Sequence, residues 1–318
     1  MKTPLKVTSS PHLKHSDTVR DIMLDVIIAL LPAAIYGCVI FGLKAAAILL
    51  CTVASAVLSE YLWNKILKKP NTIGDLSAAV TGLLLGMNLS SEVPLWIAFL
   101  GGMIAIIVVK QMFGGIGNNF ANPAIAARIV LLVSFPTAMT RFVNPVIHTV
   151  SSATPLANLG GMIENNDLPV NFTNLLFGKH SGCIGETCGF LLIVGGLYLI
   201  IRRVITPTAP ICFVGSVALL SLIFGDNVTV AVFGGGLLLG AVFMATDYTT
   251  SPTTEPGKAI FGIGCGIITF VIRHFASLPE GVSYSILIMN ILTPYINRLT
   301  LKKPFGYEKP LKEGKANE

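Results

Sequence analysis

Charged residues are scarce in this chain of 318 residues: Asp, Glu, Lys and Arg together make up 12%, about half of the roughly 25% that a soluble domain carries. Apolar residues make up 53%, and the mean hydropathy is +0.75. Apolar runs of about 20 residues, long enough to cross the hydrocarbon core of a bilayer, recur along most of the sequence. This composition excludes a soluble fold and predicts an all-α polytopic membrane protein that sits in a lipid bilayer.

Motifs that mark nucleotide-driven and metal-dependent enzymes are also missing. The sequence has no Walker A motif, no Gly-x-Gly-x-x-Gly that follows a strand, no Cys-x-x-Cys and no cluster of histidines. These absences argue against ATP hydrolysis, a Rossmann nicotinamide site and an iron–sulfur cluster held by this chain alone, and no metal site is expected. Cys183 and Cys188 flank a short glycine-containing stretch, for which a disulfide or a metal ion is an alternative to a packing role.

The net charge of +6 does not indicate a nucleic-acid binder, because the basic residues cluster in short segments between apolar runs and near both ends. This is the distribution that the positive-inside rule describes. If the chain crosses the membrane ten times, seventeen of the 22 basic residues lie on the side of the two termini, which predicts that both termini are cytoplasmic. The first twenty residues are polar and lack the apolar core of a signal peptide, so the first helix is expected to target the chain.

The apolar runs predict about ten transmembrane helices, at 22–43, 45–64, 75–90, 93–110, 123–139, 186–203, 208–225, 228–246, 258–276 and 281–299. The chain thus divides into a cytoplasmic tail (1–21), a first membrane half (22–139), an extracytoplasmic loop (140–185), a second membrane half (186–299) and a second cytoplasmic tail (300–318). A long connection such as 140–185 is typical of a functional segment.

Two similar segments hint at an internal repeat. Gly82-Leu-Leu-Leu-Gly86 in the third run is echoed by Gly236-Leu-Leu-Leu-Gly240 in the eighth. Five helices in each half would invert the second copy relative to the first, as in many transport proteins. Matches of leucine and glycine also arise by chance, so an inverted five-plus-five repeat is one of two readings.

Ionisable side chains within apolar runs are costly and are therefore candidate functional residues. The candidates are Asp25, Glu60, Arg128, Asp247 and Arg273. Asp247 and Arg273 lie near predicted helix ends, where an interfacial anchor is the alternative. Asp25 and Arg128 lie deeper, where either an ion pathway or a structural pair would explain them.

The segment from Gly114 to Ala124 combines three glycines with Asn118, Asn119 and Asn122, just before the fifth predicted helix. Irregular backbone at membrane depth is tolerated only where protein or a cavity shields it. Asn119 and Asn122 share a face on a helical turn, and their carboxamides offer donors and acceptors that suit a planar heterocycle. The alternative is that Asn and Pro merely begin the helix.

Two further segments are rich in serine and threonine and end in proline. Residues 151–155 lie in the predicted extracytoplasmic loop, and residues 247–252 follow the eighth predicted helix. Taken alone, each is an ordinary turn.

Taken together, these segments resemble the RnfD/NqrB family, the membrane subunits of the ion-pumping Rnf complex and of the sodium-translocating NADH:quinone reductase. The run from Phe113 to Arg128, residues 151–155, residues 245–252, and Pro279-Glu-Gly-Val with the later Asn290 and Pro294 occur in the same order. The compact length and short N-terminus resemble RnfD more than NqrB.

The resemblance implies a covalent flavin in the extracytoplasmic loop. The family motif Ser-(Gly/Ala/Ser)-Ala-Thr marks the attachment of FMN through its phosphate to the threonine hydroxyl. Here the motif reads Ser151, Ser152, Ala153 and Thr154, with serine where glycine is commoner. An exposed loop suits the attachment, because a phosphoester needs an accessible hydroxyl.

The resemblance also implies a second, non-covalent flavin, riboflavin, in the membrane region. The matching residues are Asn119 and Asn122. Arg128 in the same segment would compensate an anionic flavin or a phosphate, while Asp247 and Asp25 are candidates for ion handling or helix packing.

The function implied is that of a flavin-bearing subunit of a ferredoxin:NAD⁺ oxidoreductase that exports Na⁺ or H⁺ from a bacterial or archaeal cell, in the inner membrane. Its partners would be RnfA, RnfB, RnfC, RnfE and RnfG. Catalysis by this chain alone is not expected, because neither nicotinamide nor ferredoxin has a site in it. The alternative is a solute channel or secondary transporter, which composition and spacing alone would favour and which has no reason to carry FMN.

Overall fold

The computed structural model describes residues 18–143, 150–151, 156, 172–178, 180–186, 188–276 and 281–301. Both predicted tails lie almost wholly outside the described residues. So do Ser152, Ala153 and Thr154 of the predicted flavin-attachment motif. Of that motif, only the backbone of Ser151 is described.

The first half of the described chain is helical. Thr18 caps the first helix, since its side chain accepts from the backbone N–H of Asp21 while the Asp21 carboxylate accepts from the Thr18 backbone N–H. The elements in order are α1 (Val19–Phe41), α2 (Leu43–Ile66), the 3₁₀ turn η1 (Ile73–Asp75), α3 (Ser77–Met87), α4 (Leu95–Met103), the π-helix η2 (Ile104–Gln111), α5 (Pro123–Ser134) and α6 (Pro136–Met139).

A two-residue hairpin ladder and a second set of helices follow. β1 (Phe142–Val143) pairs antiparallel with β2 (Val150–Ser151), with Phe142 opposite Ser151. The later elements are α7 (Phe172–Leu176), the 3₁₀ turn η4 (Ile184–Glu186), α8 (Gly189–Ile201), α9 (Thr208–Phe224), α10 (Val228–Phe233), α11 (Leu237–Leu239), the π-helix η5 (Gly240–Met244), α12 (Glu255–Phe275) and α13 (Gly281–Thr300).

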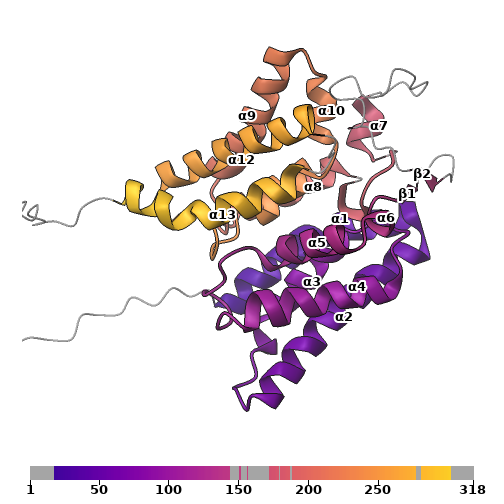
Figure 1. Ribbon diagram of the computed structural model, residues 1–318, viewed down its shortest axis with the longest axis vertical. Helices are drawn as coiled ribbons and strands as arrows, with labels where there is room; N and C mark the ends of the chain where they lie inside the picture. The colour runs from indigo at the N-terminus through magenta and orange to yellow at the C-terminus, as the bar shows by residue number, and fades with distance from the viewer. Residues whose placement is uncertain are drawn as a thin grey trace, which may run out of the picture.

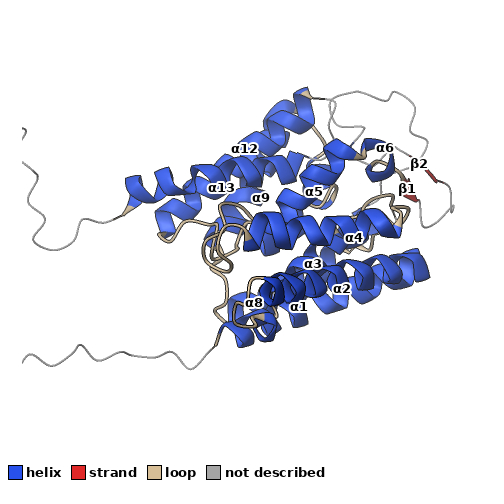
Figure 2. Cartoon of the chain, turned by 60° about the horizontal axis from the view of Figure 1, so that its bottom comes forward, coloured by secondary structure: helices blue, strands red, loops and turns tan. Residues whose placement is uncertain are grey.

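The two halves of the chain form two neighbouring groups of helices (Figure 1). In the first group α2 packs against α3 and α4, and in the second α12 packs against α9 and α13. The groups meet where α1 contacts α8 and where α5 contacts α13. The helix α1 begins and α13 ends at one end of the bundle, whereas the β1–β2 ladder and α7 lie at the opposite end (Figures 1 and 2).

Each of the ten predicted helices overlaps helical structure, but not all are continuous. The predicted helix at 228–246 is interrupted at Gly234, Gly235 and Gly236, where Gly235 and Gly236 have φ angles of 63° and 65°. Other residues disfavour this left-handed conformation, so the glycines permit the break. Of the described helices, α1, α2 and α12 are long and apolar enough to cross a membrane by themselves, and several shorter apolar helices accompany them.

The distribution of polarity is the reverse of that in a soluble protein. Large apolar side chains face outward on many helices, for example Leu43 at 89% exposure and Ile201 at 78%. Charged and polar side chains such as Glu60, Lys110 and Arg128 are buried inside the bundle. A lipid environment accounts for both observations, because it solvates apolar surface and penalises exposed charge.

Close helix packing depends on glycine in both halves. An alanine Cβ at Gly102 of α4 would overlap with Ser55 Oγ of α2, and one at Gly266 of α12 would overlap with Ser216 Oγ of α9. Both serines donate to the backbone carbonyl three residues earlier, at 3.0 Å for Ser55 and 2.9 Å for Ser216. The same glycine–serine contact therefore joins α2 to α4 in the first half and α9 to α12 in the second half.

Candidate functional site

A cavity lies at the end of the bundle where α1 begins. Its apolar wall comes from the first turns of α1, from α3, from the end of α8 and from Phe243 of η5. Nine lining side chains carry polar groups: Ser77, Thr81, Lys110, Asn119, Asn122, Thr246, Asp247, Tyr248 and Thr249. The predicted residues Asn119, Asn122 and Asp247, which are far apart in the sequence, therefore meet in one place. An apolar cavity with a few convergent polar groups is the usual form of a ligand site.

Asn122 begins a helix and also lies on the cavity lining. It is the N-cap of α5, since its Oδ1 accepts from the backbone N–H of Ala124 at 3.0 Å. Its Nδ2 also donates to the backbone carbonyl of Met244 at 3.3 Å, which ties the start of α5 to the end of η5. The helix-start reading is thus confirmed, and the same residue lines the cavity.

Asn119 differs from Asn122 because its carbonyl oxygen is buried and accepts no hydrogen bond within the described part of the chain. An unsatisfied buried acceptor costs about 1–3 kcal/mol, and such atoms are rare in native structures. The backbone before it is irregular, with φ angles of 91° at Gly115 and 92° at Gly117. The position of Asn119 in the cavity lining makes a ligand N–H the natural partner for this oxygen.

Asp247 begins a turn. The Ser251 backbone N–H donates to the Asp247 carbonyl oxygen at 2.9 Å, while the Thr249 and Thr250 hydroxyls donate to its carboxylate at 2.9 Å and 3.2 Å. Burial raises the pKa of Asp247, and the bonds from Thr249 and Thr250 oppose the rise. The turn reading of this segment is confirmed, and it holds the carboxyl group at the cavity.

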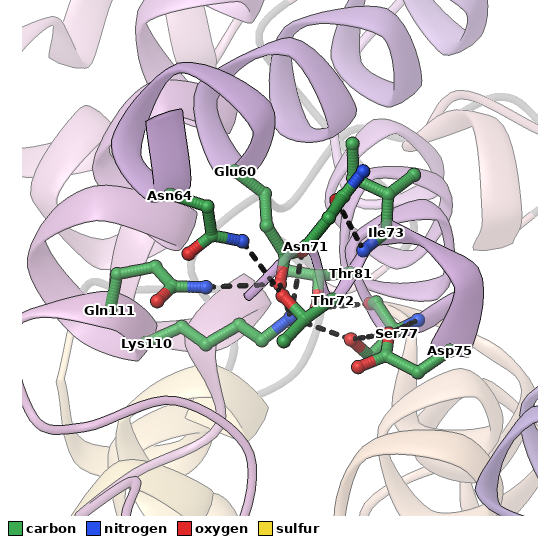
Figure 3. A network of polar contacts seen from close by, with 10 residues as sticks. All are labelled: Glu60, Asn64, Asn71, Thr72, Ile73, Asp75, Ser77, Thr81, Lys110 and Gln111. Atoms are coloured by element: carbon green, nitrogen blue, oxygen red, sulfur yellow. Dashed lines mark hydrogen bonds and ion pairs between the residues drawn. The ribbon is translucent and has the colours of Figure 1, made fainter. Parts of the chain in front are cut away.

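Glu60, one of the ionisable candidates from the sequence, forms a buried ion pair with Lys110, which the sequence did not single out (Figure 3). Lys110 Nζ lies 2.9 Å from both carboxylate oxygens of Glu60 and 2.6 Å from Ser77 Oγ. Glu60 Oε1 also accepts from Gln111 Nε2 at 2.9 Å and from Thr72 Oγ1 at 2.7 Å. The sequence shows Lys110 only as a basic residue at a helix end, whereas its side chain is 2% exposed.

Asp25 belongs to a polar clamp between α1 and α8 and does not line the cavity. Tyr198 Oη donates to its Oδ1 at 2.8 Å, and Arg202 Nη2 lies 3.1 Å from its Oδ2. Of the two readings left open for Asp25, the structure thus supplies the structural pair.

A sequence model of the NQR2, RnfD, RnfE family matches residues 6–306 of this chain. The chain belongs to this family. Three relatives match over nearly their whole length. The D subunit of the Na⁺-translocating ferredoxin:NAD⁺ oxidoreductase complex of Acetobacterium woodii is 46% identical over 98% of both chains. The D subunit of the proton-translocating complex of Clostridium ljungdahlii is 38% identical over 96% of this chain and 97% of its own. The D subunit of the ion-translocating oxidoreductase complex of Halorhodospira halophila is 32% identical over 95% of both.

This family membership and the apolar helices together indicate a multi-pass membrane protein. Arg128 of this family member lies in a second polar cluster rather than in the cavity lining. Its Nη1 donates to Asn88 Oδ1 at 2.8 Å and to Ser283 Oγ at 3.1 Å, and its Nη2 lies 3.9 Å from Glu186 Oε1. The sequence hypothesis that Arg128 compensates charge beside Asn119 is therefore not supported by its position.

Arg273 is not an interfacial anchor. It is buried, and its guanidinium donates to the backbone carbonyls of Ala231 at 2.7 Å, Gly234 at 3.3 Å and Gly235 at 2.9 Å. These carbonyls lie at the break between α10 and α11, where helical partners are lost. The anchor reading was wrong because the apolar pattern does not reveal the break that Arg273 satisfies.

Leu156 and Cys183 connect the long loop to the bundle. Leu156 is buried against Gly235, so the chain two residues after Thr154 is held at the α10–α11 break. Cys183 Sγ lies 3.4 Å from Arg128 Nη2, and Cys183 and Cys188 are not joined in a disulfide. Among the described residues no group of histidine, cysteine and carboxylate side chains is arranged to hold a metal ion.

Proposed function

We propose that this chain is the flavin-bearing membrane subunit of an ion-translocating ferredoxin:NAD⁺ oxidoreductase complex. The names of its relatives support this role, since they are the D subunits of such complexes. In this proposal the chain works with RnfA, RnfB, RnfC, RnfE and RnfG. Electron transfer through it is coupled to the export of Na⁺ or H⁺, and the names of the relatives include both ions.

One observation carries the proposal: the cavity holds an orphaned buried acceptor, Asn119 Oδ1, beside apolar walls and further hydroxyl and amide groups. The isoalloxazine ring of a flavin is planar and largely apolar, with an imide N–H and ring nitrogens along one edge. Asn119 would accept from the imide, while the second N–H of the Asn122 amide, whose first donates to the Met244 carbonyl, would donate to an acceptor on the ring. The donor set of the cavity thus fits a flavin.

The charges of the cavity favour riboflavin over a flavin nucleotide. Among the described residues that line it, Lys110 is the one basic side chain, and its ammonium lies 2.9 Å from the carboxylate of Glu60. Against the described lining, a phosphate would bring about two negative charges to a single lysine that already shares its charge with Glu60. A neutral flavin therefore suits this cavity, and FMN is assigned to the loop through a phosphoester on Thr154.

The two flavins would lie toward opposite faces of the membrane. The α1 residues that line the cavity are at the end of the bundle where α1 begins, and the β1–β2 ladder, whose second strand ends three positions before Thr154 in the sequence, is at the other end (Figure 1). With both termini cytoplasmic, the cavity is at the cytoplasmic face and Thr154 is extracytoplasmic. When bound, flavins supply electron transfer in steps of one or two electrons. The chain supplies position, hydrogen bonds and shielding from water.

In-gel flavin fluorescence after denaturing electrophoresis tests the covalent site. The native chain and Thr154→Val would both be produced in a host that has a flavin transferase. Fluorescence that survives denaturation and is lost in Thr154→Val supports the proposal. A dark native band from that host would leave Thr154 as a loop threonine, and the solute transporter reading, which the broken α10–α11 segment also suits, would then lead.

Extraction of the non-covalent flavin tests the cavity. Asn119→Leu removes the orphaned acceptor and is expected to deplete riboflavin in the purified chain while covalent FMN stays. Asn122→Leu also removes the cap of α5, which costs about 1 kcal/mol by itself, so Asn119→Leu is the sharper variant. Unchanged riboflavin in Asn119→Leu would refute the assignment.

A further inference from the structure

The Glu60–Lys110 pair is buried inside the bundle. The two side chains are 0% and 2% exposed, and they lie within a bundle whose surface faces lipid. A buried pair of this kind is weak evidence for stability, because the desolvation of two ions offsets their attraction. Buried ionisable groups in membrane proteins are functional candidates by default. We therefore expect the Glu60–Lys110 pair to have a function besides joining α2 to η2.

The pair is oriented with respect to the cavity. Lys110 and its partner Ser77 line the cavity, whereas Glu60 and Gln111 do not. The positive end of the pair thus lies at the cavity lining, and the negative end lies away from it, where Thr72 and Gln111 donate to Glu60 (Figure 3). The carboxyl group of Asp247 lies on the same lining. Within the part of the chain that the structure describes, Lys110 is the one cation and Asp247 the one carboxylate on this lining.

The local fold keeps Lys110 in this orientation. It lies in the π-helix η2, and its neighbour Gln111 also reaches Glu60, so two successive side chains of this segment converge on one carboxylate. π-Helical segments often occur at functional sites. Ser77, at the start of α3, donates its hydroxyl proton to Asp75 Oδ1 at 2.6 Å, which directs the lone pairs of its oxygen toward the Lys110 ammonium.

The charge of a flavin changes on reduction, so a fixed charge beside the ring affects its redox potential. An oxidised isoalloxazine is neutral, and its reduction by two electrons and one proton leaves one negative charge on the ring. A fixed ammonium facing the ring stabilises the reduced form more than the oxidised form, and a carboxylate opposes this. We propose that Lys110, held by Glu60 and Ser77, sets the redox potential of the flavin in the cavity as a positioning charge. This inference rests on the proposed function, since it requires a flavin beside Asn119.

The two members of the pair should act with opposite sign. Loss of the Lys110 charge weakens the binding of reduced flavin relative to oxidised flavin, so the midpoint potential falls. Loss of the Glu60 charge leaves the Lys110 ammonium uncompensated, so the potential rises. Each shift is expected to reach at least a tenfold change in the ratio of the two affinities, which for a two-electron couple is about 30 mV.

The experiment uses the full-length chain in lipid nanodiscs, in a Thr154→Val background so that the non-covalent flavin alone contributes. Lys110→Met, Lys110→Arg and Glu60→Gln are titrated with dithionite, which supplies the electrons while water supplies the proton, and the flavin spectrum is followed. The exposed pair Lys44–Glu92, at 3.0 Å, provides matched controls in Lys44→Met and Glu92→Gln, for which no shift is expected.

The proposal is supported if the flavin midpoint potential falls in Lys110→Met, rises in Glu60→Gln and stays near the native value in Lys110→Arg. If Lys110→Met does not fold or loses its flavin, Glu60→Gln decides alone, because glutamine keeps the size of the side chain and an acceptor for Thr72. Potentials equal to the native value, or shifts of one sign in both variants, would show a pair with a structural role only. A native chain without extractable flavin would instead refute the proposed function and is recognised before any titration.

Discussion

Glycine contacts between helices give a quantitative prediction. In Gly102→Ala, the new Cβ would overlap with Ser55 Oγ and would lie 3.1 Å from the Thr52 carbonyl oxygen. Ser55 can rotate away, but it then gives up its 3.0 Å hydrogen bond to Thr52, worth about 1 kcal/mol. The close carbonyl remains, so α2 and α4 must also separate slightly. Overpacking costs about 1–3 kcal/mol and the helix propensity of alanine returns about 1, so with the lost hydrogen bond the net loss is about 1–3 kcal/mol.

The equivalent contact in the second half gives a matched test. Gly266→Ala would overlap with Ser216 Oγ, and Ser216 Cβ and the Phe213 carbonyl oxygen would both lie at 2.9 Å. In the first half, Ser55→Ala would remove the overlapping hydroxyl and leave the Ser55 Cβ 3.1 Å from the Cβ of residue 102. This distance is longer than the 2.9 Å contacts at Gly266, so Ser55→Ala should restore most of the stability lost in Gly102→Ala. Removal of the Ser216 hydroxyl should restore less in Gly266→Ala.

The free energies of unfolding would be measured by titration of dodecyl sulfate into mixed micelles, with Gly215→Ala as the control. A Cβ at Gly215 meets nothing within 4 Å, so Gly215→Ala should be neutral or slightly stabilising. If Gly102→Ala is as stable as Gly215→Ala, the close packing of α2 against α4 is not rigid and the reasoning fails.

Three further predictions concern polar groups. Arg202→Met leaves the Asp25 carboxylate with the Tyr198 hydroxyl as its remaining clamp partner and should lower the free energy of unfolding by about 1–3 kcal/mol, measured in the same titration. Arg273→Met removes the donors to the carbonyls at the α10–α11 break; it should cost about 3 kcal/mol or more and expose this segment to limited proteolysis. Burial raises the pKa of the Asp247 carboxyl in the folded state above its ordinary pKa in the unfolded chain. The free energy of unfolding should therefore fall as the pH rises from the ordinary pKa through the raised pKa, and Asp247→Asn should abolish this pH dependence in thermal melts. A melt of native protein that is flat over acidic pH would contradict the last prediction.

Much of the helical pattern could be predicted from the sequence, because apolar runs report directly on burial in lipid or protein. Each predicted segment overlaps helical structure, and Asn119, Asn122 and Asp247 do line one cavity. The two similar Gly-Leu-Leu-Leu-Gly segments do not have the same structure. Gly82 and Gly86 lie within continuous α3, whereas Gly236 is left-handed and precedes α11. The similar packing of the two halves is found instead at Gly102 and Gly266, which no shared motif marks.

Long-range polar partners are what sequence reasoning missed. By its neighbours in sequence Lys110 is a basic residue at a helix end, and Glu60 is a lone acid fifty positions earlier. Nothing local shows that α2 and η2 bring them within 2.9 Å. The anchor alternative for Arg273 failed for the same reason, since its partners are backbone carbonyls at a break that the apolar pattern of 228–246 conceals. Hydropathy reports which segments are buried but not which polar atoms inside them meet.

The positions of the irregular backbone explain why several of these polar side chains are present. A continuous membrane helix satisfies its own backbone, so each departure from it must be met by side chains. Arg273 meets the break at Gly234–Gly236, and Asn122 meets the end of η5 through Met244. Asn119 is different, because its carbonyl oxygen is the one buried side-chain atom on the cavity lining that is left without a partner. Packing alone gives no reason to keep an amide there, since an apolar side chain would fill the same space without the cost of an orphaned acceptor, and this is the strongest reason to place a ligand beside it.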